Sequence, residues 1–175
     1  VKFPRATRLV ILCRSPEEAT QALAAVQEWT AAAGLTLHPT KTRIVNATDD
    51  GFEFLGDRFE NGKRYPRTKS LEKLKDTIRA KTKRTSGQCL RAIIGSLNPT
   101  LRGWFEYFKH SDRWTLTRLD QWIRMRLRSL LRKRLGLKGR GRGADHHRWP
   151  NAFFAKQGLY SLKTAHEWAC QSSSR

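Results

Sequence analysis

Apolar side chains recur at helical spacing through much of the second half of this chain. The longest stripe lies between residues 115 and 135, where successive apolar positions are three or four residues apart. Such spacing places all of them on one face of a helix. The stripe consists of Leu116, Leu119, Ile123, Leu127, Leu130 and Leu131. We interpret it as a surface that packs against other helices rather than as a cofactor pocket.

Three shorter stripes predict three further helices before this one. The first begins at a Ser70 cap, and the second is interrupted by Asn98-Pro99, where the third follows at once. Proline lacks an N–H and disfavours a helix interior, which places the boundary there. The three stripes are Leu71, Leu74 and Ile78; Leu90, Ile93, Ile94 and Leu97; and Leu101, Trp104, Phe105 and Phe108. Residues 70–136 are therefore predicted to form a helical bundle.

The first third of the chain alternates strand and helix signals. Ser15-Pro16-Glu17-Glu18 is typical of a helix start, and Gly34 is suited to end that helix. Asn61-Gly62 is a strong hairpin signal. Short strands are predicted at residues 9–13, 35–37, 43–45, 52–55 and 63–65. The fold class expected for the whole chain is α+β, with antiparallel strands and one helix before the all-α bundle.

Charge is distributed very unevenly among the 175 residues. The net charge is +20, yet residues 1–62 carry 7 basic and 8 acidic side chains. Residues 63–142 carry 24 basic and 5 acidic side chains, and residues 143–175 carry 4 and 2. An evenly charged solubilising surface would mix signs throughout and is excluded. A polyanionic partner is expected, because dense cations gain free energy by displacing counterions from phosphates.

The helix predicted at residues 115–135 carries many of these cations. Arg118, Arg128 and Arg132 lie opposite its leucine face, at about 100° per residue. The borders of that face hold Arg124, Arg126 and Lys133, and residues 121–134 contain no acid. Like charges crowded in this way cost stability unless a polyanion meets them. The segment that follows alternates glycine with Lys138, Arg140 and Arg142, so it is expected to stay open and to order on binding.

No catalytic or metal-binding constellation is visible from the residues alone. Cys13, Cys89 and Cys170 lack the spacing of a disulfide framework or a zinc site. Asp49-Asp50 reads as a turn, and His146-His147 has no ligand partner at a familiar spacing. The apolar run at residues 9–13 is too short for a membrane span or a signal peptide. A reduced, cytoplasmic protein that binds rather than catalyses, with no membrane partner, is expected.

The order of several motifs resembles the group II intron reverse transcriptase/maturase family. These motifs are Leu35-Thr36-Leu37-His38-Pro39-Thr40-Lys41-Thr42-Arg43-Ile44, Phe54-Leu55-Gly56, Leu101-Arg102-Gly103-Trp104-Phe105-Glu106-Tyr107-Phe108, Trp149-Pro150-Asn151-Ala152-Phe153-Phe154 and Gly158-Leu159-Tyr160-Ser161-Leu162. The resemblance covers essentially the whole chain. It implies the C-terminal piece of the polymerase palm at residues 1–66, a thumb and maturase-specific domain at 67–145, and the close of that domain at 146–175.

The chain also departs from the family pattern. Thr7 and Arg8 occupy the positions where the resemblance implies the two metal-binding aspartates. Lys41 matches the family lysine that lies near the incoming nucleotide. Asp57 is expected to place an exposed charge where the palm hairpin packs. No cofactor is expected in this chain, and Mg²⁺ is implied only for an intact family polymerase; the chain alone is predicted to be inactive as a polymerase.

The resulting hypothesis is a truncated or degenerate maturase that binds group II intron RNA and assists splicing. One alternative is a fragment of an RNA-directed DNA polymerase, completed by a full-length relative and contacting target DNA. The others are a general basic nucleic-acid-binding protein and a non-functional remnant. The predicted RNA-binding residues are Lys73, Arg79, Lys83, Arg84, Arg102, Arg118, Arg124, Arg128, Arg132, Lys138, Arg140 and Arg142.

Overall fold

The computed structural model describes residues 9–46 and 50–172 as two compact units. The first comprises residues 9–46, 50–54 and 59–62, and the second comprises residues 55–58 and 63–172. The boundary falls inside a small sheet, close to the end of the segment predicted to be a palm remnant. Residues 146–172 belong to the second unit together with residues 67–145. Thr7 and Arg8 lie outside the described residues.

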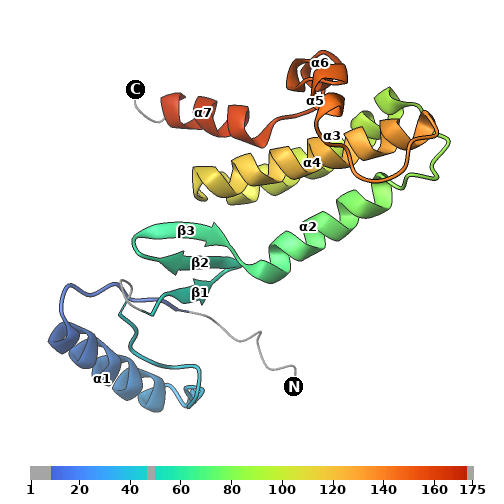
Figure 1. The fold of residues 1–175 in the computed structure, drawn as a ribbon. Coiled ribbons are helices and arrows are strands. Elements are labelled where there is room, and N and C mark those ends of the chain that lie inside the picture. Colours follow the sequence, from blue (N-terminus) through green and yellow to red (C-terminus); the bar gives the residue numbers. More distant parts are fainter. Residues whose placement is uncertain (1–8, 47–49, 173–175) are drawn as a thin grey trace. The chain divides into compact units, whose positions relative to one another are not determined.

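The first unit contains helix α1 (Pro16–Ala32) (Figure 1). Its predicted start is confirmed, because the Ser15 hydroxyl accepts a hydrogen bond from the backbone N–H of Glu18 at 3.2 Å. The Glu18 carboxylate reaches back and accepts from the backbone N–H of Arg14 at 2.7 Å. The chain turns after the helix at Gly34, whose φ of 67° favours glycine.

Three of the predicted strands are wrong. The segments at residues 9–13, 35–37 and 43–45 are irregular. A strand requires a hydrogen-bonded ladder with a neighbour, and among the described residues these segments have none. Between the second and third, the chain instead closes a turn in which the backbone N–H groups of Lys41 and Thr42 donate to the carbonyl of His38.

The sheet has strand order β1 (Phe52–Phe54), β2 (Asp57–Glu60) and β3 (Lys63–Pro66). Two-residue turns join the strands, so neighbours run antiparallel. The predicted turn at Asn61-Gly62 is confirmed, with φ of 51° and 68°. Sequence analysis missed β2, the central strand. It also missed the first turn, Leu55-Gly56, where φ is likewise positive at both residues.

The second unit is a helical bundle, which confirms the α+β class (Figure 1). Its helices are α2 (Thr68–Lys81), α3 (Leu90–Phe108), α4 (Arg113–Arg134), α5 (Ala144–Arg148), α6 (Asn151–Lys156) and α7 (Leu162–Ser172). Their apolar faces form one core, to which α2, α3, α4, α6 and α7 all contribute. Its most buried members include Ile78, Ile93, Leu97, Leu116, Leu127, Phe154 and Leu162.

Two helix boundaries differ from those predicted. Helix α2 begins at Thr68 after an Arg67 N-cap, which lies three residues before the predicted Ser70 cap. Helix α3 continues through Pro99 without interruption. The carbonyl that Pro99 leaves unbonded belongs to Gly95, which is exposed and has open space beside it. Leu97 and Leu101, on either side of Pro99, are buried in the bundle core, which holds the two halves of α3 in line.

The C-terminal segment is fastened to the bundle by polar contacts as well as by the core. The Asn98 side chain donates to the carbonyl of Gly158 at 2.8 Å and accepts from the N–H of Tyr160 at 2.9 Å. Asp120 is 3% exposed and receives the start of α7, accepting from the hydroxyl of Ser161 at 2.6 Å and from the N–H of Leu162 at 3.0 Å. These side chains close the ends of the bundle around residues 158–163.

Candidate nucleic-acid interface

The few acids of the basic region are mostly engaged within the second unit. Asp76 pairs with Arg79 at 2.5 Å, and Glu106 pairs with Lys109 at 3.6 Å. Asp112 caps α4, accepting from the N–H groups of Trp114 and Thr115. Residues 77–105 contain six basic side chains and no acid. The α2–α3 region therefore carries a positive charge that its own sequence does not balance.

The C-terminal end of α2 meets the middle of α4 through arginine and tryptophan. The Arg126 Nε donates to the Thr82 hydroxyl at 2.8 Å, and its Nη2 donates to the Thr82 carbonyl at 3.4 Å. Both Arg126 and Arg79 lie over the Trp122 ring, with Cζ at 5.4 and 5.6 Å from the ring centroid. Cation–π contact holds the two guanidinium groups on one indole.

This junction concentrates charge of one sign. Burial lowers the pKa of Arg126 from its ordinary value, and the neighbouring positive charges of Arg79 and Arg84 lower it further. The same repulsion that disfavours one guanidinium charge favours an anion at the surface of the junction. A phosphate group would supply that anion. We call Arg79, Arg84, Trp122 and Arg126 the arginine junction.

Arg128 differs from its sequence-based prediction. It was expected to project from α4 opposite the leucines, but it is only 2% exposed. The reason is that the C-terminal segment covers this face of α4. Its Nε donates to the Trp149 carbonyl at 2.9 Å, its Nη2 donates to the Asn151 side chain at 2.8 Å, and its Cζ lies 5.2 Å from the Phe154 ring centroid. Burial lowers the pKa of Arg128, with Arg124 contributing further.

The glycine-arginine segment after α4 is ordered against that helix, contrary to the expected open backbone. The N–H of Gly141 donates to the Ser129 hydroxyl at 3.1 Å, and a Cβ at Gly141 would lie 2.6 Å from the Arg128 Cβ. Only glycine fits this approach. Residues 138–142 thus form a strap along α4.

Asp145 and Arg132 hold the two ends of the strap. The Arg132 Nη1 lies 2.9 Å from the Asp145 carboxylate, and its Nε donates to the Lys138 carbonyl at 2.8 Å. Asp145 also accepts from the N–H of Arg142 at 3.0 Å. That backbone hydrogen bond lowers the pKa of Asp145, and Arg132 lowers it further against the opposing effect of burial. Arg132 is therefore half-buried and paired, not free on the surface.

The predicted RNA-binding residues fall into three groups by exposure. Arg128 is buried, while Arg124 and Arg132 are half-buried and ion-paired with Asp120 and Asp145. Arg102 is exposed but lies over the Tyr160 ring, at 4.7 Å from its centroid. The exposed group consists of Lys73, Arg79, Lys83, Arg84, Arg102, Arg118, Lys138, Arg140 and Arg142. This group occupies α2, the α2–α3 loop, α3, α4 and the strap.

Sequence analysis missed residues that position these cations or fasten the C-terminal segment to the bundle. Trp122, Asp120, Gly141 and Asn98 act through contacts with segments that are distant in the chain. An isolated acid among apolar neighbours is a signal that could have marked Asp120, since buried carboxylates require partners. The contacts of Gly141 and Asn98 leave no comparable local pattern.

The structure also gives the exposure of Asp57, Tyr107 and Lys41. Asp57 is buried, not exposed, because Arg64 on the neighbouring strand lies 2.5 Å from its carboxylate. Tyr107 is 54% exposed, and its hydroxyl donates to the Leu55 carbonyl. In the first unit, Lys41 is exposed.

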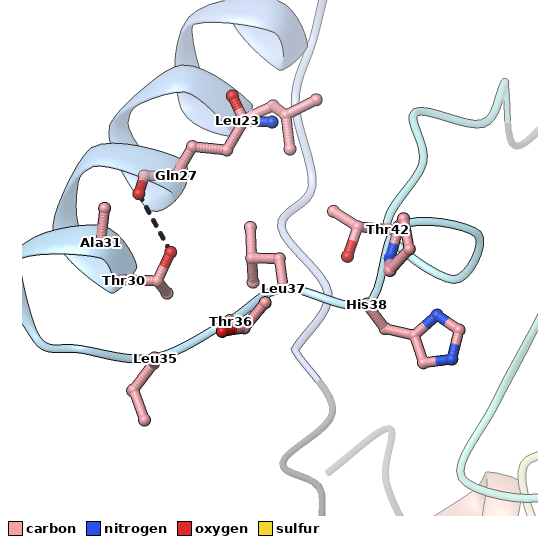
Figure 2. A pocket seen from close by; sticks show the side chains of 10 residues that line it. Leu23, Gln27, Thr30, Ala31, Leu35, Thr36, Leu37, His38 and Thr42 are labelled. Atoms are coloured by element: carbon pink, nitrogen blue, oxygen red, sulfur yellow. Dashed lines mark hydrogen bonds between the residues drawn. The ribbon is translucent and has the colours of Figure 1, made fainter.

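A hollow of about 310 Å³ in the first unit lies between the end of α1 and residues 35–42 (Figure 2). Figure 2 shows Leu23 and Leu37 beside it, with the Thr30 hydroxyl turned to the Gln27 carbonyl at 3.0 Å. The lining residues are Leu23, Gln27, Thr30, Ala31, Leu35, Thr36, Leu37, His38, Pro39 and Thr42. None of them carries a permanent charge, so the hollow is not suited to a phosphate.

Metal-ligating and membrane-spanning features were sought in residues 9–46 and 50–172. That part of the chain holds no group of three or more His, Cys, Asp or Glu side chains able to bind a metal ion. Within the same part, no helix combines the length and the apolar composition that a bilayer crossing requires.

Residues 71–149 match the family model of the group II intron maturase-specific domain. The similarity to group II intron maturases covers 79 of the 175 residues, all of them in the second unit. The matched segment runs from the first turn of α2 to the residue after α5, and it includes the arginine junction and the strap. No curated protein matches the sequence. A maturase-type function is thus supported for the unit that carries the basic surface.

Proposed function

We propose that the second unit binds group II intron RNA and assists the RNA to reach its splicing-active fold. The observation that carries this proposal is the unbalanced positive charge of residues 77–105, placed beside the arginine junction within the maturase-specific segment. Exposed cations on an ordered scaffold lose little conformational entropy on meeting phosphates. The RNA would carry out the splicing chemistry, and the protein would stabilise its fold.

The strap supports this proposal by a second route. Its backbone is held by Ser129, Arg132 and Asp145, while Lys138, Arg140 and Arg142 remain exposed. Arg140 and Arg142 are separated by the buried Gly141, so their Cα atoms are at most about 7 Å apart. Two cations at a fixed short separation can contact neighbouring phosphates of one strand.

The test measures binding of the whole chain to a group II intron RNA and to an unrelated RNA of equal length, over a range of salt concentrations. We expect tighter binding to the intron RNA at every salt concentration. Each phosphate contact contributes about 0.7 to 0.9 to the slope of log affinity against log salt. Replacing Arg118 or Arg140 by Gln should reduce the slope by about that amount, and Arg14→Gln in the first unit should leave it unchanged. Equal affinity for both RNAs would instead favour a general basic nucleic-acid-binding protein.

A second candidate function is a part in DNA polymerisation completed by another polypeptide. It is favoured by the apolar side chains exposed on the first unit, among them Leu9 at 68%, Leu12 at 84% and Trp29 at 66%. A partner chain that covers them would remove a large apolar area from water. Primer extension on an RNA template with Mg²⁺ tests it, with this chain alone and with a full-length relative added. Extension that needs both chains would support this function, and target DNA would then be a further partner.

A further inference from the structure

A second hollow, of about 380 Å³, lies between the end of α2 and the first half of α3. The last turn of α2 contributes Lys81, the connecting loop contributes Lys83, and α3 contributes Ser96. Its complete lining is Ala80, Lys81, Lys83, Thr85, Ser86, Gln88 and Ser96. Its volume falls within the range of small-ligand sites, which is about 300–1,000 Å³.

Several of the polar side chains that line this hollow can donate a hydrogen bond to a ligand, although the Ser96 hydroxyl already donates to the carbonyl of Ile93 at 2.8 Å. The two lysines supply ammonium groups, which donate and cannot accept. The Ser86 hydroxyl accepts from the N–H of Gln88 at 3.3 Å, which leaves its proton free to donate to a ligand. None of the lining residues is acidic and none is aromatic. A base would find no ring to stack on, whereas a phosphate would find several donors.

The electrostatic surroundings favour an anion in the same place. Arg79 and Arg84 lie close enough to Arg126 to lower its pKa, so the positive field extends across the end of α2. Helix α3 has Cys89 as its N-cap residue, with no side-chain hydrogen bond to the cap, and has no acid in its first turn. Its exposed N–H groups add partial positive charge. The opposing negative end of α2 is partly neutralised by Arg126, which donates to the Thr82 carbonyl.

A purely structural role explains only part of this arrangement. A lysine at a helix C-terminus stabilises the helix dipole, which accounts for Lys81. Lys83 lies in the loop beyond that helix, and the hydroxyl groups of Thr85 and Ser86 have no charge to offer the dipole. Their convergence on one hollow is what a phosphate-binding site requires.

We propose that this hollow binds one phosphate group of a nucleotide, held by Lys81, Lys83 and Ser86. The inference deepens the proposed function, because an RNA strand would present the phosphate. A nucleotide that projects from the strand, at a bulge or at a strand end, can enter a concave site that a smooth duplex cannot. The ligand chemistry itself is a phosphate ester and does not depend on the identity of the RNA.

The test titrates the whole chain with uridine 5′-monophosphate, inorganic phosphate and uridine, monitored by calorimetry and by backbone amide shifts. We expect both phosphates to bind, uridine not to bind, and the shifts to centre on residues 80–96. Lys83→Gln should weaken binding of the nucleotide about tenfold, which is the effect of one charge-assisted hydrogen bond. Lys156→Gln, an exposed lysine on α6, is the matched control and should change it less than twofold. Ser86→Ala gives a second, uncharged perturbation.

The outcomes separate this inference from the proposed function. Equal binding of uridine and its phosphate, or equal weakening by Lys83→Gln and Lys156→Gln, would overturn the site. Intron RNA that binds while neither small phosphate does would also overturn the site and would leave the proposed function standing. Small phosphates that bind at residues 80–96 when intron RNA does not bind would support the site and overturn the proposed function.

Discussion

Replacing Asp120 by alanine should destabilise the bundle more than the loss of an ordinary helix cap. Asp120 is buried on α4 and accepts three hydrogen bonds from the start of α7, from the Ser161 hydroxyl, the Leu162 N–H and the Lys163 N–H. Loss of a capping carboxylate costs about 1 kcal/mol. The Leu162 N–H is buried and would lose its partner, which costs about 1–3 kcal/mol more. We expect a total loss of about 3 kcal/mol in the free energy of unfolding.

Asp112 provides the matched control for this experiment. It caps its own helix, accepting from Trp114 and Thr115 at 3.0 and 3.3 Å, and it is only half-buried. Asp112→Ala should therefore cost about 1 kcal/mol. Urea denaturation of both variants, followed by far-UV circular dichroism, gives the two free energies on one scale.

Hydrogen exchange tests whether the loss of stability in the Asp120→Ala variant arises at the start of α7. In the Asp120→Ala variant, the amide protons of Leu162 and Lys163 should exchange faster relative to those of α3. In the Asp112→Ala variant, the amide protons of α7 should keep their protection relative to those of α3. An Asp120→Ala loss no larger than that of Asp112→Ala, or unchanged exchange at residues 162 and 163, would refute the reasoning.

Three further predictions concern the strap and the closure of the bundle. Gly141→Ala should lower the free energy of unfolding by about 1–3 kcal/mol, because a Cβ at this position has no room. Gly103→Ala, at an open position on α3, should leave the free energy of unfolding unchanged or raise it by up to about 1 kcal/mol. Thermal melts compare the stabilities of the two variants. The pKa of Asp145 in the folded protein lies below its ordinary value of 3.8. The ionised carboxylate therefore stabilises the fold above pH 3.8, and this stabilisation is lost as the pH falls through the lower, folded-state pKa. The urea midpoint should therefore fall less steeply between about pH 5 and pH 2 in Asp145→Asn than in the parent chain. Asn98→Ala removes two hydrogen bonds to residues 158 and 160 and should cost about 2 kcal/mol, measured by urea denaturation.

The bundle could be predicted from sequence because its helices are amphipathic over several turns. Leu116 to Leu130 repeat at a spacing that a helix alone explains, and the structure buries that face. Local chemistry also identified the start of α1 at Ser15 and the turn at Asn61-Gly62. Each of these signals acts within a few residues of its cause.

The errors arose where distant segments decide the outcome. Pro99 ends a helix by local rules, but the packing around it keeps α3 continuous. Arg128 lies opposite the leucines on a helical wheel, yet residues 149–154 cover it and accept hydrogen bonds from its guanidinium. The short apolar runs of the first unit resemble strands, and no ladder forms along them within the described residues. The position of a cation on a helical wheel therefore does not predict its exposure when distant segments pack on the same face.

The contacts by which residues 154–163 complete the bundle also determine when it can fold during translation. Asn98 finds its partners 60 and 62 residues further along the chain, and Asp120 finds the Leu162 N–H 42 residues further along. At about 5–20 residues per second, translation of 60 residues takes roughly 3–12 seconds. Until residues 158–163 are translated, the Asn98 side chain and the Asp120 carboxylate lack these partners, and the apolar faces of α3 and α4 lack the C-terminal part of the core. The core of the bundle is complete only after the segment that contains Phe154 and Leu162 has been translated. We therefore expect the bundle to finish folding only once α7 has left the ribosome.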